Sequence, residues 1–287
     1  MLWIVSGNLN HEGSLKTFIE LLDRYQLDYM LVKPIQYTLS FVSHDFDSFA
    51  REHTAADEPF VDSSRDIMVI GSYTLAKIAK SRGWKPGAFL ENLTHNHWKN
   101  GWGEDFLLNG DAITASVKNI QVPSNWNNFF ARPLEDTKSF SGTIFEKSNF
   151  NYWKENILKV NEKLSIHQDT EIIIAPLKDI QQECRFFVID GKIVTGSMYK
   201  LRDQVIYSEV HDTDILNFAQ KMVDKWQPNQ AFCLDIARTD EGFKIIEVNN
   251  INSSGFYASD LSKIIIALEN LQIKDIVENK NSPKVKL

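Results

Sequence analysis

The chain has 287 residues, of which 43% are hydrophobic and 24% are charged, which is ordinary for a globular protein with a large buried core. This length predicts two compact units, or one unit with an added lobe. The formal net charge is -7 and no basic stripe is visible, which argues against nucleic acid and favours a small molecule or a protein as partner. Both cysteines, Cys184 and Cys233, lie in apolar, strand-like runs, so we expect buried thiols rather than a disulfide.

Membrane association is not expected from the sequence. The longest apolar runs, such as IIIA at residues 172–175, are far shorter than a membrane span. The opening residues, MLWIVSGNLN, are apolar for only a few positions and carry no basic leader, which predicts a strand and not a signal peptide. We therefore expect a cytoplasmic protein.

The first third of the sequence alternates predicted strands with predicted helices. The strands are expected at residues 3–5, 29–32 and 67–70, and amphipathic helices are expected after Ser14 and Gly71. Strands alternating with helices over short connections predict a parallel α/β domain, which we place at residues 1–115. No glycine-rich phosphate fingerprint follows these strands, so a dinucleotide or P-loop site is not expected there. The stretch from Trp84 to Val122 has few clear periods and is not assigned.

From about residue 116 the pattern becomes richer in strands of antiparallel character. The segments NNFFARPL and SGTIFEK predict two strands joined by a polar loop at residues 135–141, followed by a helix and a buried strand that ends at Pro176. Two hairpins follow, CRFFVIDGKIVTGSMY and AFCLDIARTDEGFKIIEVNN, with a helix at residues 213–226 between them.

The second hairpin carries acidic side chains on one face. A three-residue turn with Gly242 in the left-handed position predicts that Thr239 pairs with Phe243. Counting back from the turn places Asp235 opposite Glu247, and also Cys233 opposite Asn249. The other face is then entirely apolar and carries Phe232, Leu234, Ile236, Ile246 and Val248.

The three polar residues of this face, Asp235, Glu247 and Asn249, suit a divalent cation. Two carboxylates that face each other among apolar neighbours repel and need a compensating charge, so removing one of them should leave the fold intact. The three side chains offer only oxygen ligands, which favours magnesium shared with phosphate groups and argues against zinc. The alternative, a solvated face with unrelated charges, is less favoured because all three residues share one face.

The first hairpin carries basic side chains. Its Asp190-Gly191 turn predicts this pairing: Ile189 with Lys192, Arg185 with Gly196, and Glu183 with Met198. In that register Glu183, Arg185 and Lys200 share one face, and Gly196 leaves space in front of Arg185. Arginine and lysine beside an acidic metal site are what a polyphosphate requires. Taken without the acidic hairpin, this hairpin is explained equally well as a ladder of alternating surface charges.

Upstream, the segment ARPLEDTKSFSG places Arg132 at a strand end and Lys138 in a loop of small and polar residues. Such a loop could fold over phosphate groups with its backbone N–H groups. A lysine in a polar loop is usually only solvated, so this signal is weak by itself.

The order of these features resembles the ATP-grasp superfamily over roughly residues 123–268. The matching features are, in order, Arg132 and Lys138, the APLK segment at residues 175–178 where the hinge strand ends, Glu183 and Arg185 in an E-x-R strand, Lys200, Asp235, and EVNNINSSGFY. Most ATP-grasp enzymes have lysine where Arg132 stands and arginine where Lys200 stands. The second exchange is similar to the Arg-to-Lys clade of the superfamily, which occurs in phage and bacteria.

The resemblance implies a mixed fold, α/β and α+β. A pre-grasp α/β domain at residues 1–115 would precede the two ATP-grasp subdomains, at residues 116–178 and 179–287, with ATP in the cleft between them. The hinge residues Pro176, Leu177 and Lys178 would recognise adenine through their backbone; because Pro176 has no N–H, Leu177 or Lys178 must donate. Glu183 would accept hydrogen bonds from the ribose.

For the phosphates, the resemblance implies contacts from Arg132, Lys138, Arg185 and Lys200, of which Arg185 and Lys200 would be catalytic. One or two Mg²⁺ ions would be held by Asp235, Glu247 and Asn249. Just beyond, Ser253, Ser254 and Gly255 are candidates for holding a substrate carboxylate, although a turn leading into the next helix explains them equally well.

The activity implied by the resemblance is an ADP-forming ligation. A carboxylate would attack the γ-phosphate of ATP, and an amine of a small molecule, peptide or protein would capture the acyl phosphate. Two alternatives stay open. A small-molecule kinase on the same scaffold would phosphorylate a hydroxyl group instead, and the exchanges at Arg132 and Lys200 would also fit a non-catalytic nucleotide-binding module. Substrate identity and oligomeric state do not follow from the sequence.

Overall fold

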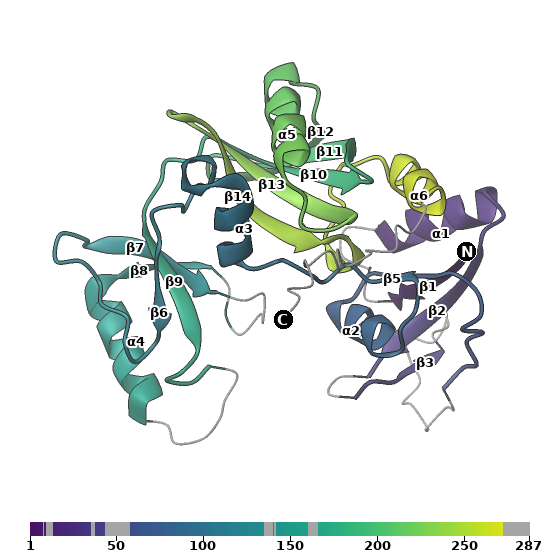
Figure 1. Ribbon diagram of the computed structural model, residues 1–287, viewed down its shortest axis with the longest axis horizontal. Helices are drawn as coiled ribbons and strands as arrows, with labels where there is room; N and C mark the ends of the chain where they lie inside the picture. The colour runs from purple at the N-terminus through teal and green to yellow at the C-terminus, as the bar shows by residue number, and fades with distance from the viewer. Residues whose placement is uncertain are drawn as a thin grey trace, which may run out of the picture.

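The computed structural model describes residues 1–7, 9, 14–35, 38–43, 58–134, 140, 142–159 and 166–271. Three sheets with their helices make up the described chain (Figure 1). Among these residues no helix has the length and apolar content that crossing a membrane requires.

The amino-terminal sheet is the predicted parallel α/β unit. Its strands, in the order β3-β2-β1-β4-β5, are β1 (Leu2–Ser6), β2 (Asp28–Pro34), β3 (Phe41–Ser43), β4 (Ile67–Ile70) and β5 (Pro86–Gly87). Strand β1 pairs in parallel with β2 and β4, and only β3 is antiparallel to its neighbour. Helices α1 (Ser14–Arg24) and α2 (Tyr73–Ser81) bury their apolar stripes against this sheet, as their periodicity predicts.

The second sheet is antiparallel and has the order β6-β9-β7-β8. Its strands are β6 (Ile113–Ser116), β7 (Asn128–Pro133), β8 (Thr143–Glu146) and β9 (Glu171–Pro176), and helix α4 (Lys147–Lys159) covers them. Strands β7 and β8 are the two predicted on either side of the polar loop. Strand β6 spans the proposed domain limit at residues 115 and 116, so the division of the chain into domains stays a prediction.

The third sheet holds both hairpins and is antiparallel throughout, in the order β12-β11-β10-β13-β14. Its strands are β10 (Gln182–Ile189), β11 (Lys192–Leu201), β12 (Gln204–Glu209), β13 (Ala231–Thr239) and β14 (Gly242–Asn250). Helix α5 (Thr213–Lys225) packs on one face. The turn of the first hairpin, Asp190-Gly191, has positive φ angles of 48° and 78°, as a two-residue hairpin turn requires.

Residues that the sequence left unassigned connect the first two sheets. They form helix α3 (His95–Trp102) and the short helix η2 (Glu104–Phe106), and Trp98, Trp102 and Leu107 belong to the core beneath the third sheet. Residue 101, inside α3, must be glycine, because the Trp226 ring would come within 2.2 Å of an added Cβ. The backbone of residues 107 and 108 bonds to Ile245 and so covers the edge of β14.

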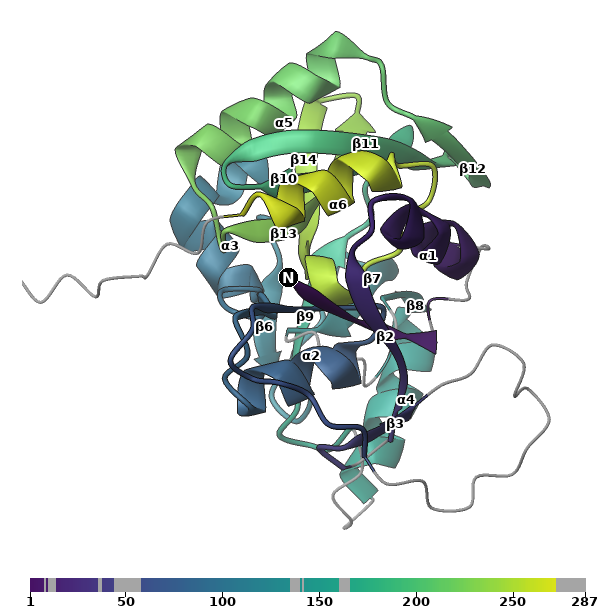
Figure 2. The same cartoon turned by 90° about the vertical axis from the view of Figure 1, so that its right-hand side faces the viewer.

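The amino-terminal unit and the third sheet share one hydrophobic core. Trp3 and Phe18 of the first unit lie in the same cluster as Phe187 of β10 and Phe256, with Phe256 stacked between the other two phenylalanine rings. Helix α6 (Leu261–Glu269) contributes to this cluster and lies beside α1 (Figures 1 and 2). The segment that follows the acidic hairpin is therefore anchored on the amino-terminal unit.

Candidate functional site

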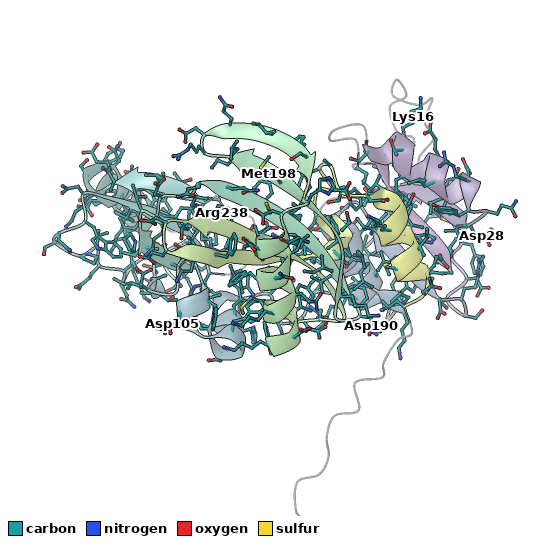
Figure 3. The ribbon with its side chains drawn as sticks, turned by 90° about the horizontal axis from the view of Figure 1, so that it is seen from above. Lys16, Asp28, Asp105, Asp190, Met198 and Arg238 are labelled. Atoms are coloured by element: carbon teal, nitrogen blue, oxygen red, sulfur yellow. The ribbon has the colours of Figure 1, made fainter. Side chains whose placement is uncertain are left out.

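The predicted site residues of the two hairpins lie on one face of the third sheet. The acidic hairpin has the predicted pairing of Asp235 with Glu247 and of Cys233 with Asn249. The first hairpin pairs Glu183 with Lys200, and Arg185 lies next to Asp235 on the adjoining strand. In Figure 3 Asp190 and Arg238 lie toward opposite ends of this sheet. Glu183, Arg185 and Asp235 lie on the strands between these ends.

The register of the acidic hairpin is correct at Asp235, although the predicted turn is wrong. Thr239 pairs with Gly242 and not with Phe243, so the turn holds two residues instead of three. A β-bulge between Asp235 and Ile236 then restores the predicted pairing, because one extra residue on β14 shifts the register by one. The same bulge places Ile245 in the core, where the sequence predicts Ile246.

The register of the basic hairpin differs more from the prediction. An irregularity between Phe187 and Val188 places Arg185 opposite Ser197 and Gly196 opposite Phe186. A second one, between Glu183 and Cys184, places Glu183 opposite Lys200 and not opposite Met198 as predicted. An added Cβ at Gly196 would come within 2.5 Å of the Phe186 ring, so this glycine makes room for the core and not for a ligand of Arg185. The predicted common face of Glu183, Arg185 and Lys200 is confirmed by the contacts described next.

Arg185 and Asp235 form a buried pair with two parallel hydrogen bonds. Nε of Arg185 donates to Oδ1 of Asp235 at 2.8 Å, and Nη2 donates to Oδ2 at 2.7 Å. The Asp235 side chain is only 1% exposed. Burial raises the pKa of Asp235 to about 6, although the Arg185 guanidinium opposes that rise. Burial alone would lower the pKa of Arg185, but the neighbouring carboxylate raises it well above its usual value.

Glu247 pairs with an arginine from a different sheet. Nη1 of Arg132, on β7, lies 2.9 Å from Oε2 of Glu247. Nδ2 of Asn249 donates to Oε1 of Glu247 at 2.9 Å and contacts Oδ2 of Asp235 at 3.3 Å, so the amide bridges the two carboxylates. The repulsion expected from the sequence is therefore offset by one arginine per carboxylate and by this amide.

Glu183 is the third carboxylate of the face and has two partners. Nζ of Lys200 lies 2.9 Å from its Oε1, and the hydroxyl of Tyr199 donates to its Oε2 at 2.9 Å. Burial raises the pKa of Tyr199 well above its usual value, so the phenol stays protonated as a donor.

Tyr257 is a site residue that the sequence reasoning missed. Its ring lies between those of Tyr199 and Tyr207, with 5.1 Å between the centroids of each pair, and Cζ of Arg185 lies 5.1 Å from its ring centroid. Tyr257 has a φ of 52°, which is uncommon for a residue with a side chain, and strained backbone of this kind clusters at functional sites. Its one signal in the sequence is that it ends the EVNNINSSGFY segment; the stack itself could not be predicted, because the three tyrosines come from different segments.

Asn252 was missed as well, although it lies inside the EVNNINSSGFY segment. It is fully buried, its amide nitrogen donates to the carbonyls of Val69 (2.8 Å) and Gly87 (3.0 Å), and its oxygen accepts from the N–H of Phe89 (2.9 Å). This side chain ties the segment after the acidic hairpin to the ends of β4 and β5.

The predicted substrate residues lie in this tied segment. The hydroxyl of Ser253 bonds to Oδ1 of Asn250 at 2.9 Å, and that of Ser254 donates to the Asn250 carbonyl at 2.7 Å. The carbonyl of Gly255 accepts a long hydrogen bond of 3.4 Å from Nη1 of Arg185. These contacts within the segment agree with the alternative of a turn that leads into the next helix.

The predicted adenine-binding residues lie at the connection between β9 and β10. Pro176 ends β9, Leu177 is exposed, and Nζ of Lys178 pairs with Oδ2 of Asp111 at 2.7 Å. Leu177 and Lys178 line an open pocket of about 580 Å³, whose other walls come from residues 104–111 and from the turn of the acidic hairpin. Lys138 lies outside the described residues.

The donor chemistry of the acidic face fits magnesium better than it fits a transition metal. In the described part of the chain no three His, Cys, Asp or Glu side chains gather as a metal site. Asp235, Glu247 and Asn249 supply two carboxylates and one amide, a set that holds magnesium only when a substrate supplies further oxygen ligands. Rotation of the Asn249 amide by 180° would present its oxygen in place of its nitrogen.

Comparison with known proteins agrees with the fold described above. The chain is similar in structure to D-cycloserine synthetase DcsG (TM-score 0.60, 10% identity, 93% of this chain and 98% of that chain). It is also similar to D-alanine–D-alanine ligase from Bacillus anthracis complexed with ATP (TM-score 0.55, 14% identity, 94% and 92%), and to the ATP-grasp ligase PsnB complexed with a minimal precursor (0.51, 10%, 93% and 97%). At such identities the likeness establishes the fold.

A search of curated proteins gives no significant match. The model of family 3 of the Arg-to-Lys clade of ATP-grasp domains matches residues 34–268, which is well over half of the chain. The expectation drawn from the order of motifs is thereby confirmed: the protein belongs to the Arg-to-Lys clade of the ATP-grasp superfamily.

Proposed function

We propose that the protein is an ATP- and magnesium-dependent ligase that joins a carboxylate to an amine through an acyl phosphate, releasing ADP and phosphate. Family membership supports the nucleotide and the general class of reaction. What carries the proposal is one face on which three basic side chains each meet an acidic partner. The pairs are Arg132 with Glu247, Arg185 with Asp235, and Lys200 with Glu183.

The basic side chains are suited to a triphosphate because they come from different strands and converge. Lys200 is 41% exposed and Arg132 is 16% exposed, so both can turn toward a ligand, whereas Arg185 is nearly buried. Among the described residues, the one hydrogen-bond acceptor of Nη1 of Arg185 is the distant Gly255 carbonyl, so we assign Nη1 to phosphate. We assign Lys138, which follows β7 in the sequence, to the same task.

The acidic trio would hold magnesium. When bound, the ion would neutralise charge on the triphosphate and so favour attack at the terminal phosphorus. Asp235, Glu247 and Asn249 would orient it from one side, and Arg132 would be displaced from Glu247 toward the phosphates. The protein's own contribution is then positioning and charge compensation.

The nucleoside would lie along the connection between β9 and β10. The backbone of Leu177 or Lys178 would donate to adenine, with Pro176 as a wall, and Glu183 would accept from the ribose once Lys200 moves to phosphate. The open pocket beside Leu177 and Lys178 supports access at this end of the site.

The reaction would proceed in two displacements. A substrate carboxylate oxygen attacks the γ-phosphorus, the bond to the β–γ bridging oxygen breaks, and ADP leaves while Arg185 and Lys200 stabilise the charge on the transferred group. An amine nitrogen then attacks the acyl carbon, the bond to the phosphate oxygen breaks, and phosphate leaves as the amine loses a proton. The backbone at Ser253, Ser254 and Gly255 would hold the substrate carboxylate, and an amino acid, a peptide or a protein would be the substrate.

Hydroxylamine provides the test. The full chain with MgATP should release ADP and phosphate only when both a carboxylate and an amine are supplied, for example by pooled amino acids or peptides. Hydroxylamine in place of the amine should trap the acyl phosphate as a hydroxamate detectable by mass. Phosphate retained on a hydroxyl product would show a kinase instead. Nucleotide binding without turnover across the panel would show a non-catalytic module.

A further inference from the structure

Helix α3 brings an aromatic wall against the site. Trp98 is 2% exposed and belongs to the core beneath the third sheet, yet Cζ of Arg132 lies over its ring at 5.1 Å from the centroid. His95, also nearly buried, lies edge-to-face with Trp98 at 6.0 Å. Arg132 comes from the second sheet and Glu247 from the third, so α3 adds a third element around this ion pair.

The hydrogen-bonding capacity of Arg132 is only partly used in this position. Its one hydrogen bond described by the structure joins Nη1 to Glu247, and within the described residues its buried Nη2 has no hydrogen-bond partner. Arg185, in contrast, uses three nitrogens, two on Asp235 and one on Gly255. A buried N–H without an acceptor costs free energy, so Arg132 gains more than Arg185 from a new oxygen acceptor.

The aromatic wall leaves the hydrogen-bonding edges of this arginine available. A guanidinium stacked on a ring is held in a plane by cation–π attraction, but its N–H groups point outward in that plane and can change partners. Burial lowers the pKa of His95 to about 4, so its imidazole is neutral at neutral pH and does not repel the arginine. Its Nε2 bonds to the carbonyl of Asn109 at 3.0 Å, which holds the ring in place.

We propose that Trp98 is a positioning residue that keeps Arg132 poised beside Glu247 and lets it exchange this carboxylate for the phosphates of the nucleotide. This inference rests on the proposed binding of MgATP. In it Arg132 is the arginine that changes partners, and Arg185 keeps its pair with Asp235. Because both partners of Arg132 are oxygen anions, the exchange needs only a change of acceptor at the guanidinium while Cζ stays over the Trp98 ring.

Coupling between Trp98 and Arg132 in nucleotide affinity tests the exchange. We expect Trp98→Phe, which keeps a weaker ring, to raise the Kd of the full chain for MgATP about fivefold, and Trp98→Leu to raise it further. Arg132→Lys keeps the charge but loses the planar guanidinium over the ring, so adding Trp98→Phe to it should change the Kd by less than about twofold. Isothermal titration with MgADP or a non-hydrolysable MgATP analogue measures binding without turnover.

Trp102→Phe is the matched control, because Trp102 lies one turn further along α3, is fully buried, and lies edge-to-face with Trp226 instead of beneath an arginine. It should lower stability in urea without changing the Kd. Two results would overturn the inference while leaving the proposed function standing. One is that the fold-changes in Kd of Trp98→Phe and Arg132→Lys multiply in the double variant. The other is that Trp98→Phe folds and leaves the Kd unchanged. A wild-type chain that does not bind the nucleotide would overturn both.

Discussion

Neutralising the two carboxylates of the acidic hairpin should affect the protein in different ways. Asp235→Asn and Glu247→Gln should each abolish magnesium-dependent ATP turnover, because each removes a proposed metal ligand. The sequence alone suggests that both folds survive, since repulsion is relieved. The structure alters this expectation for Asp235, whose two oxygens bond to a buried arginine.

The magnitudes follow from burial. In Asp235→Asn the Arg185 charge stays buried without a counter-charge, and breaking such a pair costs about 3–5 kcal/mol of unfolding free energy. We expect this cost to outweigh the relief of desolvation at Asp235, the effect that raises the pKa of its carboxyl, because asparagine is buried in the same place. Glu247 is 32% exposed, its partner Arg132 is nearer the surface than Arg185, and glutamine still offers an oxygen. Glu247→Gln should therefore cost no more than about 1 kcal/mol.

Urea unfolding followed by far-UV circular dichroism, in EDTA and without nucleotide, separates stability from metal binding. The double variant Arg185→Gln with Asp235→Asn is the control, because it removes both charges and should be more stable than Asp235→Asn alone. Equal midpoints for Asp235→Asn and Glu247→Gln, or a double variant weaker than the single one, would refute the assignment of Arg185 as the counter-charge of Asp235.

Two further predictions concern residues away from the metal ligands. Gly196→Ala should lower the unfolding free energy by about 1–3 kcal/mol in a urea titration, because its Cβ would meet the buried Phe186 ring. The Kd for MgATP should stay unchanged. A higher Kd with normal stability would instead support the register predicted from the sequence. The second concerns His95, whose pKa is lowered in the folded protein from 6.5 to about 4 by burial. Its contribution to stability is therefore complete above pH 6.5 and is lost as the pH falls toward 4, about 2 kcal/mol of it between pH 7 and pH 5. His95→Asn should make the unfolding free energy less dependent on pH by that amount, and an unchanged slope would contradict a neutral, buried imidazole.

Much of the local structure could be predicted from the sequence because it is encoded locally. The Asp190-Gly191 turn, the helical spacing after Ser14 and the period-two pattern of the hairpins each depend on neighbours in the chain. The three oxygen-bearing residues of the acidic hairpin share a face for the same reason, since side chains alternate along a strand. The order of these motifs was enough to indicate the family.

Bulges decide the register beyond the turns, and the sequence does not show them. In the acidic hairpin a turn that is one residue shorter than expected and one extra residue at the bulge cancel, so Asp235 meets Glu247 as predicted. In the basic hairpin no such cancellation occurs, and Gly196 meets Phe186 instead of Arg185. A bulge changes the direction of side chains relative to the neighbouring strand, so its position depends on how the whole sheet packs.

Which charges meet was decided only by the tertiary structure. The sequence placed Asp235 and Glu247 together and required a counter-charge, and packing supplied one arginine from the neighbouring strand and another from a different sheet. Trp98 lies in a stretch that periodicity did not assign, and Tyr257 takes part only through rings from distant segments. A local pattern fixes which face of an element a side chain occupies, but the partner across that face depends on how the three sheets pack.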